Sequence, residues 1–112
     1  AQYQVVSNGE LVETKEDGDR KIFHWYQKQV HPTYLMALAV GEFDVIQDQW
    51  QDIPVTYYVE KVRQDQGQIT MGKTPRMVEF LSDKYGYKYA FPKYAQVCAA
   101  DFIFGGMENT SV

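Results

Sequence analysis

Short segments rich in aromatic and β-branched residues fill the first 62 residues of the chain, and polar turn sequences separate them. This pattern favours β-strands, as do the nine tyrosines and six phenylalanines of the sequence. Asn8-Gly9 tolerates a positive φ angle and predicts a tight hairpin turn, Gly18 marks a second polar turn, and Gly41 predicts a bend. We therefore expect an antiparallel meander of about five strands, within residues 2–14, 21–30, 33–46 and 55–62.

The pattern changes at residues 63–73, which are polar and contain glycine, and we expect them to form a connector. A helix is predicted directly after this connector, over residues 74–86. Thr74 suits the N-cap, Pro75 suits the first helical position, and Gly86 suits the position just past the end. Val78, Leu81 and Tyr85 fall on one face of this helix, with Met77 beside them.

A final strand is predicted over residues 94–104, after an aromatic loop. Apolar residues lie on both of its faces, as is typical of a sheet that is covered on both sides. The chain is thus expected to be mainly β, or α+β, with an antiparallel sheet followed by a helix and a strand. The change of pattern at the connector also suggests a domain boundary, which we place between residues 1–64 and 65–112.

Charge and composition exclude two classes of protein. The formal net charge is −4 and the sequence has no basic stripe, which argues against nucleic-acid binding. No apolar run approaches the length of a membrane span. Cys98 is the only cysteine, and its apolar neighbours predict a buried thiol. Because one cysteine cannot form an internal disulfide, the chain does not depend on an oxidising compartment. A cytoplasmic location is expected, although no residue of the sequence encodes it.

The stretch Phe104–Asn109, with the sequence FGGMEN, contains the residues best suited to bind a ligand. Gly105 and Gly106 lack a Cβ, so another backbone can approach the main chain closely. Glu108 adds a carboxylate beside that surface, which can pair with an ammonium group such as the free N-terminus of a peptide. A simpler interpretation remains open, in which the glycines form a turn and Glu108 is merely solvated.

GGMEN resembles the exopeptidase signature of the M1 family of zinc aminopeptidases, which is written GAMEN or GGMEN. Three longer stretches also resemble the family, in the family's order: VVSNGELVE, HPTYLMALAVGEF and YGYKYAFPKYAQVCAADFIFGGMEN. The resemblance implies that residues 1–64 form the end of a saddle-like N-terminal β domain. Residues 65–112 would then open a thermolysin-like catalytic domain, and the chain would be an internal piece of a larger parent enzyme.

The resemblance also implies roles for the signature residues. Glu108 would bind the α-amino group of a peptide substrate, and Gly105 and Gly106 would hydrogen-bond the substrate backbone. Met107 and Asn109 would belong to the same wall of the substrate site. The expected partners are therefore peptides with a free N-terminus, together with the remainder of the parent chain.

Zinc is the cofactor that the resemblance implies, yet the family's HExxH motif does not occur among these 112 residues. His24 and His31 lie seven apart, whereas two zinc ligands on one helix lie four apart. We expect both to be structural or surface residues and expect the zinc ligands to lie beyond Val112. No catalytic or metal-binding residue is assigned within the chain, which alone is predicted to be inactive.

Two alternatives remain open at this point. The parent could belong to the leukotriene hydrolase branch of the same family, which also uses a GGMEN signature and would add epoxide hydrolysis. The chain could instead be part of a non-catalytic, β-rich binding or scaffold module that keeps the family fold without its chemistry.

Overall fold

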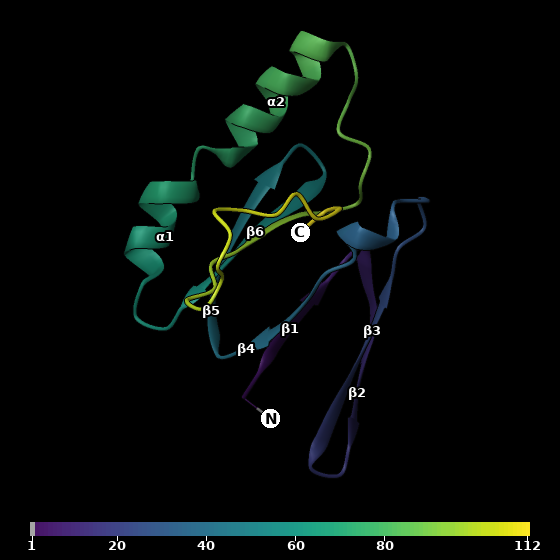
Figure 1. The fold of residues 1–112 in the computed structure, drawn as a ribbon, viewed down its shortest axis with the longest axis vertical. Helices are drawn as coiled ribbons and strands as arrows, with labels where there is room; N and C mark the ends of the chain where they lie inside the picture. Colours follow the sequence, from purple (N-terminus) through teal and green to yellow (C-terminus); the bar gives the residue numbers. More distant parts are fainter. Residues whose placement is uncertain (1) are drawn as a thin grey trace.

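A computed structural model describes residues 2–112, and Figure 1 shows two helices beside a sheet and a long hairpin that projects away from them. The strands alternate with short turns in the first half, and both α-helices follow them in sequence. The elements are β1 (Gln4–Ser7), β2 (Glu10–Asp17), β3 (Arg20–Tyr26), a 3-10 helix (Thr33–Leu35), β4 (Leu38–Gly41), β5 (Phe43–Trp50), β6 (Ile53–Glu60), α1 (Gln64–Met71), α2 (Thr74–Tyr85) and β7 (Tyr94–Val97).

The strands form three separate sheets rather than one meander. β1 pairs with β4, β2 pairs with β3, and β5, β6 and β7 form a third sheet in that order. All pairs are antiparallel except β6 and β7, which run parallel. The predicted fold class, mainly β or α+β, is confirmed.

The hairpin predicted at Asn8-Gly9 is wrong, although the positive φ angle of Gly9 is confirmed at +75°. The strands on either side of this dipeptide pair with other strands and not with each other. The dipeptide is therefore a junction at which the chain passes from one sheet to another. The turn at Gly18 is confirmed, with a φ of +60°, and it closes the β2–β3 hairpin.

The long strand predicted over residues 33–46 is divided into three parts. Its start is the 3-10 helix, its middle is β4, and its end is the first half of β5. The predicted bend at Gly41 is confirmed, because β4 ends there and β5 begins in another sheet. Glycine suits this position, because the ring of Phe43 lies 2.8 Å from the place where a Cβ on Gly41 would be.

Helix α2 is confirmed, and Gly86 ends it with a left-handed φ of +64°. The predicted N-cap is wrong, because Lys73 occupies that position and Thr74 already lies in the helix. The Thr74 hydroxyl donates instead to Oε1 of Gln96 at 2.9 Å. Of the three apolar residues predicted to share one face, Val78 is buried, whereas Leu81 is 48% exposed and Tyr85 is 74% exposed.

The connector predicted over residues 63–73 is wrong as well, because most of it forms α1. Gly67 lies where α1 packs on the sheet, and a Cβ there would be 2.8 Å from side-chain atoms of Ile46 and Val59. Close packing on the sheet, rather than an amphipathic pattern, holds this helix in place. Within residues 2–112, neither helix has the length and apolar character needed to cross a lipid bilayer.

Two hydrophobic clusters meet at β6. One consists of Trp50, Ile53, Val55, Tyr57, Val59, Met71 and Val78, and the other of Val6, Tyr58 and Ala95. Because adjacent residues of β6 enter different clusters, this strand packs on both faces. Residues from both predicted domains contribute to each cluster, and the boundary at residue 64 stays a prediction.

The last predicted strand, residues 94–104, is shorter than expected. β7 ends at Val97, and the amide of Cys98 makes a last bond to the carbonyl of Tyr58 at 2.9 Å. The chain then leaves the sheet, so the prediction of a buried thiol is wrong and Cys98 is exposed.

Candidate functional site

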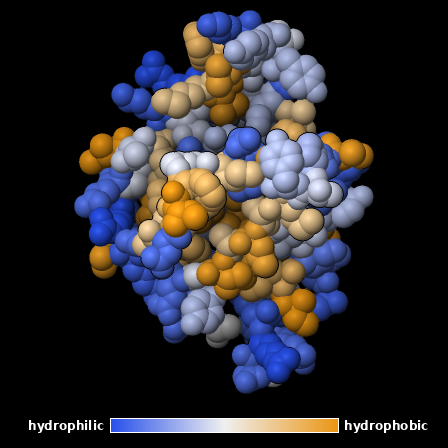
Figure 2. All heavy atoms as spheres, viewed as in Figure 1, coloured by the Kyte–Doolittle hydropathy of each residue, from blue (hydrophilic) through white to orange (hydrophobic). Residues whose placement is uncertain are grey.

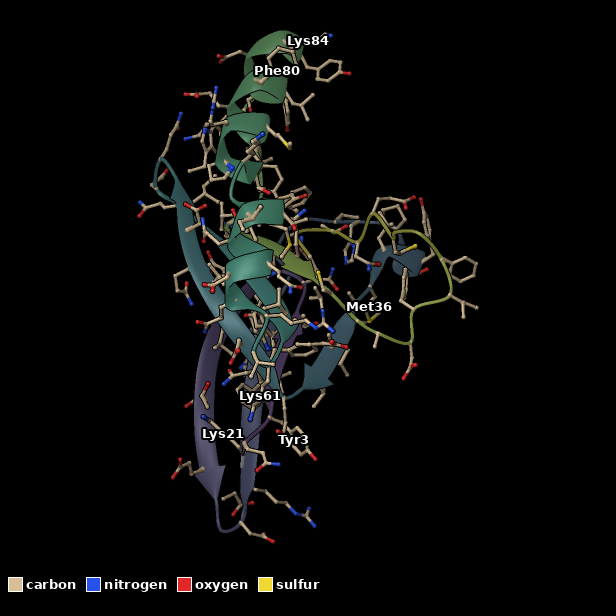
Figure 3. The ribbon with its side chains drawn as sticks, turned by 90° about the vertical axis from the view of Figure 1, so that its left-hand side faces the viewer. Tyr3, Lys21, Met36, Lys61, Phe80 and Lys84 are labelled. Carbon is tan, nitrogen blue, oxygen red and sulfur yellow. The ribbon has the colours of Figure 1, made fainter. Side chains whose placement is uncertain are left out.

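The five residues Gly105 to Asn109 lie in an irregular loop that follows β7. In Figure 3 this loop bulges away from the sheet, with Met36 at its base. A Cβ built on Gly105 or Gly106 would meet no atom within 4 Å. Internal packing therefore does not require glycine at these two positions, and the space beside them is open to another molecule.

A cavity of about 980 Å³ lies between this loop, α1 and the adjacent ends of β4, β6 and β7. The loop contributes Gly105, Gly106, Met107 and Asn109 to its lining. Figure 2 shows apolar residues gathered at the centre of the face that Figure 1 presents. The volume is at the upper end of the range for ligand pockets, about 300 to 1,000 Å³.

Glu108 is exposed and does not belong to the lining of the cavity. Among residues 2–112, no side chain forms an ion pair with it. Its carboxylate is therefore free to accept hydrogen bonds from a bound cation at the rim. Met107 is 38% exposed, and the carbonyl of the half-buried Asn109 accepts a bond from the amide of Val112 at 3.3 Å.

The residues that follow the loop are buried, unlike the loop itself. Thr110 is 6% exposed and Ser111 is 4% exposed. The carbonyl of Thr110 accepts a hydrogen bond from Nδ2 of Asn8 at 2.6 Å, and its amide donates to the carbonyl of Leu35 at 3.3 Å. The carbonyl of Ser111 accepts from the amide of Ala95 at 3.1 Å. The loop is thus exposed at its tip and fixed at its end.

Lys93 is the buried cation nearest to this end of the loop. Its ammonium donates to the carbonyl of Ser111 at 3.0 Å and to the hydroxyl of Ser111 at 3.3 Å. It also lies 5.2 Å from the centre of the Trp25 ring. Burial lowers the pKa of Lys93 to about 8. From the sequence, Asn8 is predicted only to form a turn and Lys93 is not singled out, because only the fold brings these residues to the loop.

The described residues do not fit a zinc site. His24 lies on β3 opposite Glu13, and His31 lies in the segment that follows β3. Across residues 2–112, no group of three or more histidine, cysteine, aspartate or glutamate side chains is placed to hold a metal ion.

Residues 69–112 match the model of the peptidase family M1 domain. The chain is 30% identical over 94% of its length to "Probable aminopeptidase 2" of Sulfurisphaera tokodaii, and 30% identical over 93% to "Aminopeptidase M1" of Arabidopsis thaliana. It is 26% identical over 94% of its length to "Aminopeptidase N" of Caulobacter vibrioides. The chain spans only 13%, 12% and 13% of the lengths of these relatives, respectively.

Proposed function

The chain belongs to the M1 family of peptidases, and from this premise we propose that it is part of a zinc-dependent aminopeptidase that removes N-terminal residues from peptides. Its contribution is the loop from Gly105 to Asn109, which binds the free α-amine and the backbone of the substrate. Residues 1–64 would belong to the N-terminal β domain of the parent, and residues 65–112 to the start of its catalytic domain.

One observation carries the proposal. Glu108 is an exposed carboxylate without an ion-pair partner among residues 2–112, and it follows two glycines whose surroundings are open. Gly105 and Gly106 differ from the turn glycine Gly18 in having no positive φ angle, and no neighbouring atom excludes a side chain from either position. Both features are those of a surface that meets a second molecule.

The loop then divides the recognition of a peptide between two kinds of contact. The free N–H and C=O groups of Gly105 and Gly106 can pair with the substrate backbone as an added strand would. Glu108 accepts hydrogen bonds from the ammonium group, which a peptide has only at its N-terminus or on a lysine side chain. Met107 and Asn109 lie on the cavity wall beside these contacts.

The proposed zinc ion would be held by residues elsewhere in the parent protein, since no group of three or more possible ligands is found among residues 2–112. We therefore expect these residues alone to bind no catalytic zinc and to hydrolyse no peptide. Once bound in the parent, zinc would supply the Lewis acid that peptide hydrolysis requires. The role of this chain is to place the first peptide bond correctly and not to carry out the chemical step.

The test is a kinetic comparison of Glu108 variants of the parent enzyme. Glu108→Ala and Glu108→Gln should each cost about 2 to 3 kcal/mol of transition-state binding for an aminoacyl-anilide with a free amine, which is the scale of a lost charge-assisted hydrogen bond. The N-acetylated anilide should be affected little, so the preference for free amines should collapse.

Glu79→Gln is the matched control, because Glu79 is likewise an exposed carboxylate but lies on α2 and not in the loop from Gly105 to Asn109. It should leave both substrates unaffected. If the Glu108 variants keep the full preference for free amines, then this residue does not bind the α-amine.

A further inference from the structure

The segment just after the loop is held by side chains that lie far away in the sequence. Thr110 and Ser111 are buried, whereas each residue from Cys98 to Glu108 is exposed. Figure 1 shows that the chain, drawn in yellow at this end, finishes beside the 3-10 helix and the junction between β1 and β2. Contacts with this junction are therefore in a position to fix the end of the loop.

Asn8 is 4% exposed and uses both ends of its amide group. Nδ2 donates to the carbonyls of Thr110 at 2.6 Å and Leu35 at 3.1 Å, and Oδ1 accepts from the amide of Ala37 at 2.7 Å. All three partners are backbone atoms, so Asn8 ties the loop end directly to the segment around the 3-10 helix. An aspartate could accept the bond from Ala37, but it could not donate to the two carbonyls.

Gly9 continues this contact through its own backbone. Its amide donates to the Ser111 hydroxyl at 3.0 Å. A side chain is excluded at Gly9, because a Cβ would lie 2.0 Å from the carbonyl oxygen of Tyr26. Ser111 in turn has a φ of +63°. A non-glycine residue keeps such an unfavourable conformation only where its surroundings impose it.

Lys93 supplies the remaining support and is 8% exposed. Within residues 2–112 it has no carboxylate partner, and its ammonium donates to the carbonyl and the hydroxyl of Ser111. Burial of an ammonium without a carboxylate partner costs free energy, so stabilisation of the fold is a weak explanation for its presence. Placement of the loop end accounts for this buried cation better than stabilisation of the fold does.

We propose that Asn8 and Lys93 are positioning residues for substrate binding, which hold Thr110 and Ser111 so that Glu108 keeps a fixed place at the cavity rim. This inference rests on the proposed function of Glu108. The junction between β1 and β2 thereby takes an indirect part in amine recognition, although it lies 102 residues from Thr110 and Ser111 in the sequence.

Two variants of the parent enzyme test the inference. Asn8→Asp removes the donor to Thr110 and keeps the acceptor for Ala37, and Lys93→Met removes the ammonium and keeps the apolar stem. Each should lower kcat/KM for a free-amine anilide by about 10- to 100-fold, the scale of a small misplacement of a binding group. The loss should lie mainly in KM, and the N-acetylated anilide should be nearly unaffected.

Lys88→Met is the matched control. Lys88 is also a lysine near a tryptophan, 5.7 Å from the Trp50 ring, but it is exposed and pairs with Asp52. It should leave both kinetic constants unchanged.

Because Asn8→Asp places a carboxylate opposite two carbonyls and could prevent folding, Ser111→Ala serves as a milder variant that removes only the hydroxyl.

Amide hydrogen exchange of the segment from Gly105 to Val112 gives a readout that does not depend on catalysis. Exchange in this segment should become faster in Asn8→Asp, Lys93→Met and Ser111→Ala, and it should be unchanged in Lys88→Met and Glu108→Ala. If exchange is unchanged in the first three variants, the support does not exist. A second outcome would also overturn the inference: exchange rises in the three support variants, yet they keep the preference for free amines that the Glu108 variants lose. In that case the support does not serve amine binding, whereas the proposed function of Glu108 stands.

Discussion

Glu108 and Lys93 carry opposite charges in opposite environments near the same loop. Glu108 is exposed, as a group that binds an incoming cation must be, whereas Lys93 is 8% exposed and donates only to neutral oxygens of Ser111. The exposed group is suited to recognise a ligand, and the buried one to hold the backbone that presents it.

The lowered pKa of Lys93 predicts how the stability of the chain depends on pH. The pKa is about 8 in the folded chain and 10.5 as the reference for the unfolded chain. Between these values the unfolded state binds more protons, so the free energy of unfolding rises with pH. From pH 7 to pH 9.5 the gain should be about 2 kcal/mol.

Urea unfolding of the chain at several pH values measures this gain, with Lys93→Met as the comparison. The variant should show a flat profile in the same window, and an equal slope in both proteins would contradict the assignment. The window ends below pH 10, because burial raises the pKa of Tyr89 and of Tyr94 and their ionisation opposes folding at higher pH.

Residue-scale features differed in how well the sequence could reveal them. The loop from Gly105 to Asn109 could be proposed as a candidate site from the sequence, because its glycines and its carboxylate are adjacent in the chain. Asn8 and Lys93 could not be recognised, because their meaning depends on partners up to 102 residues away. The exposure of Cys98 was also missed, since its apolar neighbours do not show where β7 leaves the sheet.

At the scale of elements, two glycines with positive φ angles have different structural roles. Gly9 and Gly18 have φ angles of +75° and +60°, so both occupy a region that disfavours other residues. A Cβ on Gly18 would meet nothing within 4 Å, whereas a Cβ on Gly9 would collide with the backbone of Tyr26. Gly18 therefore serves only its turn, whereas Gly9 also permits two elements to approach closely.

Alanine substitutions at these two glycines should therefore differ in cost. Gly18→Ala should lower the free energy of unfolding by about 1 kcal/mol, the cost of a left-handed conformation. Gly9→Ala should lower it by more than about 3 kcal/mol, because the backbone itself must move. Thermal unfolding of both variants checks this order, and equal costs would contradict the close approach at Gly9.

Elements with local signals could be predicted and the others could not. α2 has Pro75 near its start and Gly86 at its end, so the sequence marks both limits of the helix. α1 has no such marks, and its packing depends on Gly67 lying against β5 and β6. Most strand segments were found, although residues 47–50 of β5 were missed and the last strand was predicted to run past Val97. The strand partners were not found, because pairing between distant strands leaves little trace in a local pattern.

At the scale of the whole molecule, β6 connects the two predicted domains. β6 pairs antiparallel with β5 and parallel with β7, and its residues enter both hydrophobic clusters. Val55 is 1% exposed and lies opposite Tyr94 in this pairing. We therefore expect residues 2–112 to unfold as one cooperative unit.

Val55→Ala tests this expectation. Removal of two buried carbon atoms should lower the free energy of unfolding by about 2 kcal/mol, from lost apolar transfer and the remaining cavity. Val30→Ala is the control, because Val30 is fully exposed and its loss should change stability by less than about 0.5 kcal/mol. Circular dichroism and tryptophan fluorescence should give the same midpoint, and two separate transitions would contradict a shared core.

The most direct test of the account is a crystal structure of the parent enzyme with a non-hydrolysable peptide analogue that has a free N-terminus. The account predicts that a carboxylate oxygen of Glu108 lies about 2.7 to 2.9 Å from the ammonium nitrogen, the distance of a charge-assisted hydrogen bond. The first residues of the analogue should lie along Gly105 and Gly106. A complex in which other groups hold the ammonium and Glu108 faces solvent would contradict the account.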